Sequence, residues 1–106
     1  MLMINHYKYA SMKINIESLN DHNFIVTVKS GIITSHRVNL SDEYTEFLTL
    51  GRLTKKELIQ FSFRFLLERE PNTSILKSFD LKDISKYFSE FEETAKNWSF
   101  SIKKTS

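Results

Sequence analysis

Cysteine is absent from this sequence, and glycine and proline are scarce. The 106 residues include no Cys, two Gly and one Pro. Without Cys the chain has no disulfide, no thiolate nucleophile and no cysteine-ligated zinc site. Disordered and linker-like chains are enriched in Gly and Pro, so this composition favours a folded chain. Nothing in it requires an oxidising compartment, and we expect a cytoplasmic protein.

Long hydrophobic runs and a strong excess of one charge are also missing. No stretch approaches the roughly 18 apolar residues of a membrane helix, and residues 1–11 lack the continuous apolar run of a signal peptide. Fifteen basic and 13 acidic residues leave a formal charge of +2. Nucleic-acid binding would therefore depend on a local basic patch instead of the whole molecule.

The length fits one domain. The regular hydrophobic pattern begins at Met12. We expect residues 1–11 to be a poorly ordered N-terminal extension, residues 12–98 to form a single α+β domain, and residues 99–106 to be a C-terminal tail.

No arrangement typical of a catalytic or metal site is present. His6, His22 and His36 are not at metal-ligand spacing. There is no G-x-S-x-G motif and no glycine-rich phosphate loop, and the carboxylates form no identifiable acid/base pair. We expect no enzyme activity, no cofactor and no metal. His36 falls on the apolar face of a strand, where a hydrogen-bonded, semi-buried histidine is commoner than a catalytic base.

Residues 12–40 predict three β-strands. Apolar and polar residues alternate in 12–17, 24–29 and 32–40, which is the period of a half-buried strand. Turn-forming residues separate these segments at 20–23 and 30–31. We expect a three-stranded antiparallel β-meander.

From residue 41 the pattern becomes helical. Ser41 can cap a short helix that ends at Gly51. Thr54 and Glu57 match a capping box, and they predict a helix from Lys55 to about Arg69. Leu53 and Leu58 have the spacing of a hydrophobic staple around that cap.

Shorter helices are predicted after Pro71, which stops the long helix. Ile75, Leu76 and Phe79 suggest a short helical turn. Asp80 can cap another helix, whose apolar face would comprise Leu81, Ile84, Tyr87 and Phe88. Residues 90–98 continue a helical pattern. The predicted fold class is α+β, with the meander packed on a central helix and followed by short C-terminal helices.

The central helix is apolar around most of its circumference. Residues 58–67 have apolar side chains at seven of ten positions, more than the stripe of a surface helix. One interpretation places this helix between the sheet and the C-terminal helices. The other assigns part of its surface to a homodimer or partner interface; the two are compatible.

Charged residues at the end of this helix form the candidate interaction site. Arg69 falls within the apolar arc and needs a partner, for which Asp80, Asp83 and Glu70 are candidates. Glu68 and Glu70 lie where the helix dipole disfavours negative charge. Local rule violations of this kind can mark a functional site. The structural alternative is that Arg69 and Arg64 compensate these carboxylates, with Arg64 and Glu68 at i, i+4 spacing.

Part of the C-terminal half resembles a group of small uncharacterised bacterial proteins. The segments FRFLLEREPNTSIL (63–76), FDL (79–81) and YFSEFE (87–92) carry the likeness, which would extend over residues 12–92. That group has similar LLEREP, SIL, FDL and YFPEYE strings, often with a proline where Ser89 stands here. The resemblance implies no known activity, and it draws attention to residues 68–71 as a unit.

Three functional hypotheses remain open. The first is a non-enzymatic intracellular protein-interaction or regulatory module, acting as a homodimer or on another protein. The second is a nucleic-acid-associated protein, because Lys13, Lys29 and Arg37 could line the exposed face of the sheet. The third is an antitoxin-like or phage-encoded inhibitor, which no particular residue selects.

Overall fold

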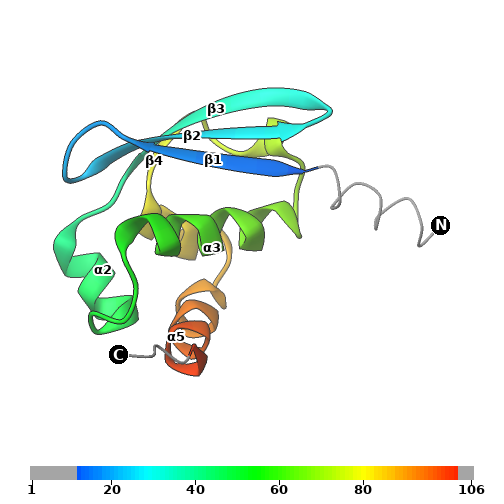
Figure 1. The fold of residues 1–106 in the computed structure, drawn as a ribbon. Coiled ribbons are helices and arrows are strands. Elements are labelled where there is room, and N and C mark those ends of the chain that lie inside the picture. The colour runs from blue at the N-terminus through cyan, green and yellow to red at the C-terminus, as the bar shows by residue number, and fades with distance from the viewer. Residues whose placement is uncertain (1–11, 103–106) are drawn as a thin grey trace.

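A four-stranded mixed sheet forms one layer of the fold in the computed structural model, which describes residues 12–102. Its strands are β1 (Lys13–Ser18), β2 (Asn23–Ser30), β3 (Ile32–Asn39) and β4 (Ser78–Asp80), in the order β1-β2-β3-β4. The first three are antiparallel, as predicted. Figure 1 shows helices on only one side of this sheet. Residues 1–11 and 103–106, including the predicted N-terminal extension, lie outside the described residues.

Two short turns set the register of the meander. The Asn20 side chain accepts hydrogen bonds from the backbone N–H groups of His22 and Asn23, at 2.9 and 3.0 Å, which closes the first turn. Gly31 supplies a positive φ of 78° in the second turn. Val26 and Val28 then point to the helical side and are fully buried.

The fourth strand corrects the prediction of a short helical turn. Phe79 lies in β4, which pairs in parallel with β3, whereas the helical turn is a 3-10 helix, η1, at Asn72–Ser74. A three-residue strand is too short for its alternation to be recognised in a sequence. It is held by long-range contacts, including a 2.7 Å hydrogen bond from the Arg37 N–H to the Lys77 carbonyl.

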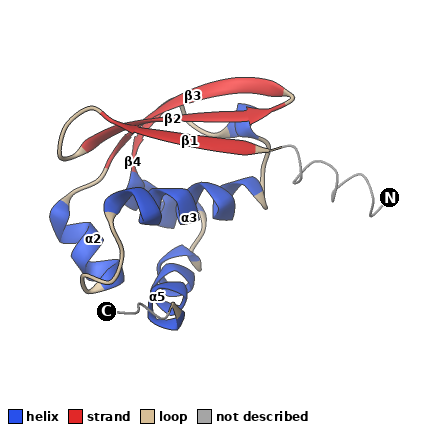
Figure 2. Cartoon of the chain, in the orientation of Figure 1, coloured by secondary structure: helices blue, strands red, loops and turns tan. Residues whose placement is uncertain are grey.

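The helices, blue in Figure 2, lie on one side of the strands. Their starts follow the predicted capping residues. The Ser41 side chain accepts the Tyr44 N–H and begins α2 (Asp42–Thr49). Thr54 and Glu57 form the expected capping box of α3 (Lys55–Leu67). Helix α3 ends two residues before Arg69.

Helix α3 is buried on two opposite sides, because its phenylalanines alternate between these sides along the helix. Residues 61 and 65 are one turn apart and share a face, whereas residue 63 lies on the opposite side. Phe63 is fully buried and contacts the ring of Phe79, with centroids 6.0 Å apart. Phe65 contacts the ring of Phe91 at 5.2 Å. The interpretation of α3 as a central helix between the sheet and the C-terminal helices is confirmed.

The C-terminal segment is more ordered than predicted. Asp80 caps a 3-10 helix, η2 (Leu81–Asp83), followed by α4 (Ile84–Tyr87) and α5 (Phe91–Ser101). Ser99, the first residue of the predicted tail, is buried in α5. The guanidinium of Arg52 donates to the carbonyls of Ser99 and Ile102, at 2.9 and 2.5 Å. The last carbonyls of any helix lack partners within the helix. Here Arg52, which is distant in the sequence, donates hydrogen bonds to two carbonyls at the end of α5.

Helix α2 is tied to α5 through Tyr44. Its hydroxyl donates a 2.8 Å hydrogen bond to the Glu92 carboxylate. Burial is the main cause that raises the pKa of Tyr44, and the adjacent Glu92 carboxylate raises it further.

No helix among residues 12–102 has the length and apolar character to cross a membrane.

Candidate functional site

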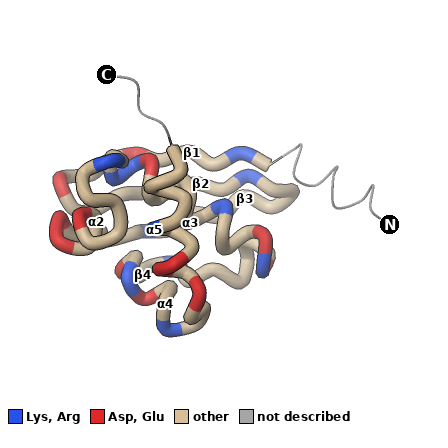
Figure 3. The backbone as a smooth tube through the Cα atoms, turned by 90° about the horizontal axis from the view of Figure 1, so that it is seen from below, with Lys and Arg blue, Asp and Glu red and all other residues tan. Residues whose placement is uncertain are grey.

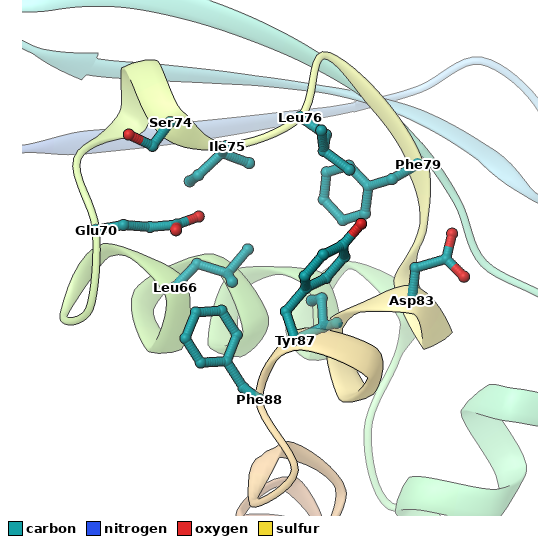
Figure 4. A pocket seen from close by; sticks show the side chains of 10 residues that line it. Leu66, Glu70, Ser74, Ile75, Leu76, Phe79, Asp83, Tyr87 and Phe88 are labelled. Carbon is teal, nitrogen blue, oxygen red and sulfur yellow. The ribbon is translucent and has the colours of Figure 1, made fainter.

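A groove of about 350 Å³ lies between the end of α3, the segment from η1 to β4, and α4. Figure 4 shows the side chains of these elements converging on it. The lining residues come from three consecutive parts of the chain: Leu66, Glu70, Ser74, Ile75, Leu76, Phe79, Asp83, Ile84, Tyr87 and Phe88. Its volume falls in the range of ligand and side-chain binding pockets.

The groove has a buried apolar floor and an exposed apolar mouth. Leu66, Ile75 and Ile84 are buried. Leu76 and Tyr87 remain 51% and 69% exposed. The sequence pattern placed Tyr87 on the apolar face of a helix, and the structure corrects this: α4 ends at Tyr87 and its ring is largely solvent-exposed. A large aromatic side chain over an apolar floor is typical of a binding surface.

Buried polar residues fix the wall between η1 and β4. Asn72 donates hydrogen bonds to the Ile32 carbonyl and the Thr34 hydroxyl, at 2.8 and 3.0 Å. His36 is 1% exposed, and its ring nitrogens lie 2.8 Å from the Leu76 carbonyl and the Thr34 hydroxyl. His36 is therefore hydrogen-bonded, as predicted, and more deeply buried than expected. These bonds anchor the groove wall to the sheet.

Two carboxylates lie at opposite ends of the groove. Figure 4 shows Glu70 entering beside Ser74 and Asp83 on the far side. Asp83 is paired with Lys86 at 3.1 Å, and this hydrogen bond lowers the pKa of Asp83. Glu70 has no hydrogen bond or ion pair from its carboxylate to any residue in the described range 12–102. Burial in the groove raises the pKa of Glu70.

No positive charge balances Glu70 within the groove. Its ten lining residues include no Lys, Arg or His. The combination of an apolar floor, an exposed tyrosine and an unpaired carboxylate can receive a cation that carries an apolar stem. The methylene chains of Lys and Arg have this character.

The predicted cluster of Glu68, Arg69, Glu70 and Arg64 does not form one site. Glu70 lines the groove, whereas Glu68 and Arg69 pair with each other at 3.4 Å. Arg64 lies beside the Gln60 side chain, whose oxygen accepts two bonds of 3.2 Å when the amide is oriented toward the guanidinium. Only Glu70 of the four candidates belongs to the groove.

Arg69 has a structural role with partners other than those predicted. Its Nε donates to Glu90 at 3.3 Å, and its Nη1 donates to the Phe65 carbonyl at 2.8 Å. The guanidinium also lies 3.5 Å from the centre of the Phe65 ring, a cation–π contact. The predicted partners Asp80 and Asp83 are instead engaged at the start of η2, in their own capping box. Arg69 therefore fastens the end of α3 to the start of α5.

Sequence reasoning missed the other groove residues because they were assigned to hydrophobic faces. Leu76, Phe79 and Tyr87 match core patterns, and only the path of the chain around β4 brings them to one surface. The signal that pointed toward the groove was the unfavourable carboxylate Glu70 at a helix end.

No metal centre is formed within the described part of the chain, since no group of three or more His, Asp or Glu side chains there could hold an ion. No protein-family model, curated protein or solved structure matches this chain. The likeness of residues 63–92 to small bacterial proteins therefore stays a prediction, and the function must be argued from the groove.

Proposed function

We propose that this protein is a non-enzymatic interaction module whose groove binds a segment of a partner protein. The segment would present a Lys or Arg side chain beside an apolar one. The observation that carries the proposal is the Glu70 carboxylate, which lies in an apolar groove without a positively charged neighbour.

The chemistry of the groove favours this class of partner. An ionised carboxylate in apolar surroundings is destabilised until a cation or a hydrogen-bond donor reaches it. A bound ammonium or guanidinium would satisfy Glu70 and could also lie against the face of Tyr87. The apolar neighbour in the segment would cover Leu76, which is half exposed.

A peptide-binding assay tests the proposal. The probes are fluorescent peptides with a central Lys or Arg flanked by Leu, Ile or Phe, and matched peptides with Gln or Glu at the central position. We expect the basic peptides to bind more tightly in fluorescence anisotropy. Glu70→Gln should weaken that binding on the order of tenfold, because a charge-assisted bond becomes a neutral one.

Glu68→Gln is the matched control. Glu68 is an exposed carboxylate two residues away that pairs with Arg69 outside the groove. Its substitution should leave the affinity unchanged. Equal binding of basic and acidic peptides, or equal loss with both variants, would contradict the proposal.

Nucleic-acid binding is a second candidate because of the outer face of the sheet. The strand registers place the exposed side chains of Lys13, Lys29 and Arg37 on that face. The aromatic residues of the described strands, Phe24 and Phe79, pack in or against the core instead, so this face lacks the stacking platform of single-strand binders. Titration with DNA and RNA over a salt series tests it, and no binding at low salt would eliminate it.

A further inference from the structure

Strand β1 is an edge strand whose outer side has no partner within residues 12–102. The sheet order places β1 at one end, next to β2 only. An exposed edge offers a row of backbone donors and acceptors to another strand. The side chains of Ile14 and Ile16 are half-buried and pack against the core, whereas Lys13, Asn15 and Glu17 are exposed on the outer face.

The hydrogen-bonding pattern identifies the backbone groups at this edge. The Leu19 N–H donates to the Asn23 carbonyl at 2.8 Å, in register with the β1–β2 pairing. Backbone groups alternate in direction along an antiparallel strand, so the odd-numbered residues of β1 bond to β2. The N–H and carbonyl groups of Ile14 and Ile16 therefore face outward.

We propose that two copies of this chain associate through β1, antiparallel and about a two-fold axis at Asn15. Ile14 of one copy then pairs with Ile16 of the other and exchanges both backbone hydrogen bonds with it. The two sheets become one continuous sheet. This is a mode of homodimerisation that does not use the groove beside Glu70, so it is independent of the peptide-binding proposal.

Charge complementarity selects this register. With Asn15 opposite its own copy, Lys13 lies opposite Glu17 of the second copy, and the same contact forms twice. These are non-hydrogen-bonded positions, where side chains across antiparallel strands are closest. Moving the register by two residues in either direction, or pairing the strands in parallel, removes these contacts.

The monomer also holds an unfavourable arrangement that the dimer would relieve. Lys13 lies directly opposite Lys29 in the β1–β2 register, and like charges at such positions are destabilising. Figure 3 shows the basic positions on β1 and β2 side by side at the end of the sheet near the N-terminus. Glu17 of a second copy would bring a negative charge to this pair.

The apolar part of the surface beneath the edge can receive the apolar face of a second strand. This part comprises Ile16, Trp98 and Ile102, which line an open groove of about 500 Å³ together with Lys56, Glu57 and Gln60. Trp98 stacks on Phe61 with ring centroids 4.6 Å apart and is itself half-buried. Ile14 and Ile16 of the second copy would extend the apolar layer over this surface.

Charge reversal with rescue tests the dimer and its register together. The measurement is light-scattering mass over a concentration series, which gives the dimer Kd. We expect the wild type to approach twice the 12.5 kDa chain mass. Lys13→Glu and Glu17→Lys should each raise the Kd on the order of tenfold or more, because two attractive pairs become repulsive. The double variant restores both pairs and should return the Kd to near the wild-type value.

Arg37→Glu is the control, since Arg37 is exposed on the same face but lies on β3, away from the proposed interface. It should leave the Kd unchanged. Circular dichroism confirms that each variant is folded, as expected for exposed positions. A monomeric wild type would overturn the proposal. Single variants with the wild-type Kd, or a double variant that stays monomeric, would also overturn it.

Discussion

Glu70 is the residue at which stability and the proposed function are opposed. Burial raises the pKa of its carboxyl above the ordinary 4.5, so the folded protein binds this proton more tightly than the unfolded chain does. Ionisation of Glu70 therefore disfavours folding. Its contribution to the free energy of unfolding is most favourable at low pH and declines as the pH rises through the ordinary value to the raised one.

Glu70→Gln should stabilise the protein at neutral pH, because glutamine is uncharged in both states. Well below pH 4.5 the wild-type carboxyl is also neutral, and the difference should largely vanish. Urea denaturation of both proteins between pH 3 and 7 measures it. Subtraction of the two curves removes the contributions of the other carboxylates. A variant that is less stable than the wild type at neutral pH would show that Glu70 has a stabilising partner.

Asn72 is one of two buried polar residues that anchor the groove wall to the sheet. Asn72→Ala removes donors to Ile32 and Thr34 in a buried place, and we expect a loss of about 1–3 kcal/mol in the free energy of unfolding. Thr73→Ala is the control in the same turn, since Thr73 is exposed. Chemical denaturation distinguishes the two, and equal losses would contradict this role.

Sequence reasoning at the residue level succeeded for local interactions and failed for distant ones. Ser41, Thr54 and Asp80 cap their helices as predicted, because a cap depends on residues within one turn. One of the partners of Arg69 is Glu90, twenty-one residues away. Nothing local specifies that contact, which depends on where α5 packs.

At the level of elements, long segments with a regular hydrophobic pattern were predicted, and short segments or helix ends without such a pattern were missed. The meander and α3 have long, regular patterns and were predicted with bounds close to those observed. Strand β4 and the extension of α5 to Ser101 were missed. Both depend on tertiary contacts: β4 pairs with β3, and the C-terminal end of α5 is held by Arg52.

Arg52→Ala should therefore loosen the end of α5. The loss of two hydrogen bonds from a charged donor to terminal carbonyls should cost about 1–3 kcal/mol. Amide hydrogen exchange should accelerate at residues 98–101, while the protection of α3 changes only with the global stability. Arg64→Ala, an exposed arginine beside Gln60, is the control. Unchanged exchange at the end of α5 would contradict the role assigned to Arg52.

At the scale of the whole molecule, the order of layers explains why function was hard to predict. The sheet and the C-terminal helices bury opposite faces of α3 (Figure 1), so its broad apolar arc is mostly core. The surfaces proposed for partners are the groove around Glu70 and the outer side of β1. The groove is lined by residues between 66 and 88, which only the turns of the chain around β4 bring to one surface, and β1 is open at its outer side because of the strand order. Composition and spacing therefore carried little information about either surface.

The most direct test of the groove is the location of binding, measured by amide chemical-shift mapping with a basic, apolar peptide from the anisotropy assay. We expect the largest shifts within residues 66–88, at Glu70, Leu76 and Tyr87, and expect them to be reduced in Glu70→Gln. Shifts confined to the outer sheet face, or shifts at the groove that are unchanged in Glu70→Gln, would contradict recognition of a cation by this carboxylate.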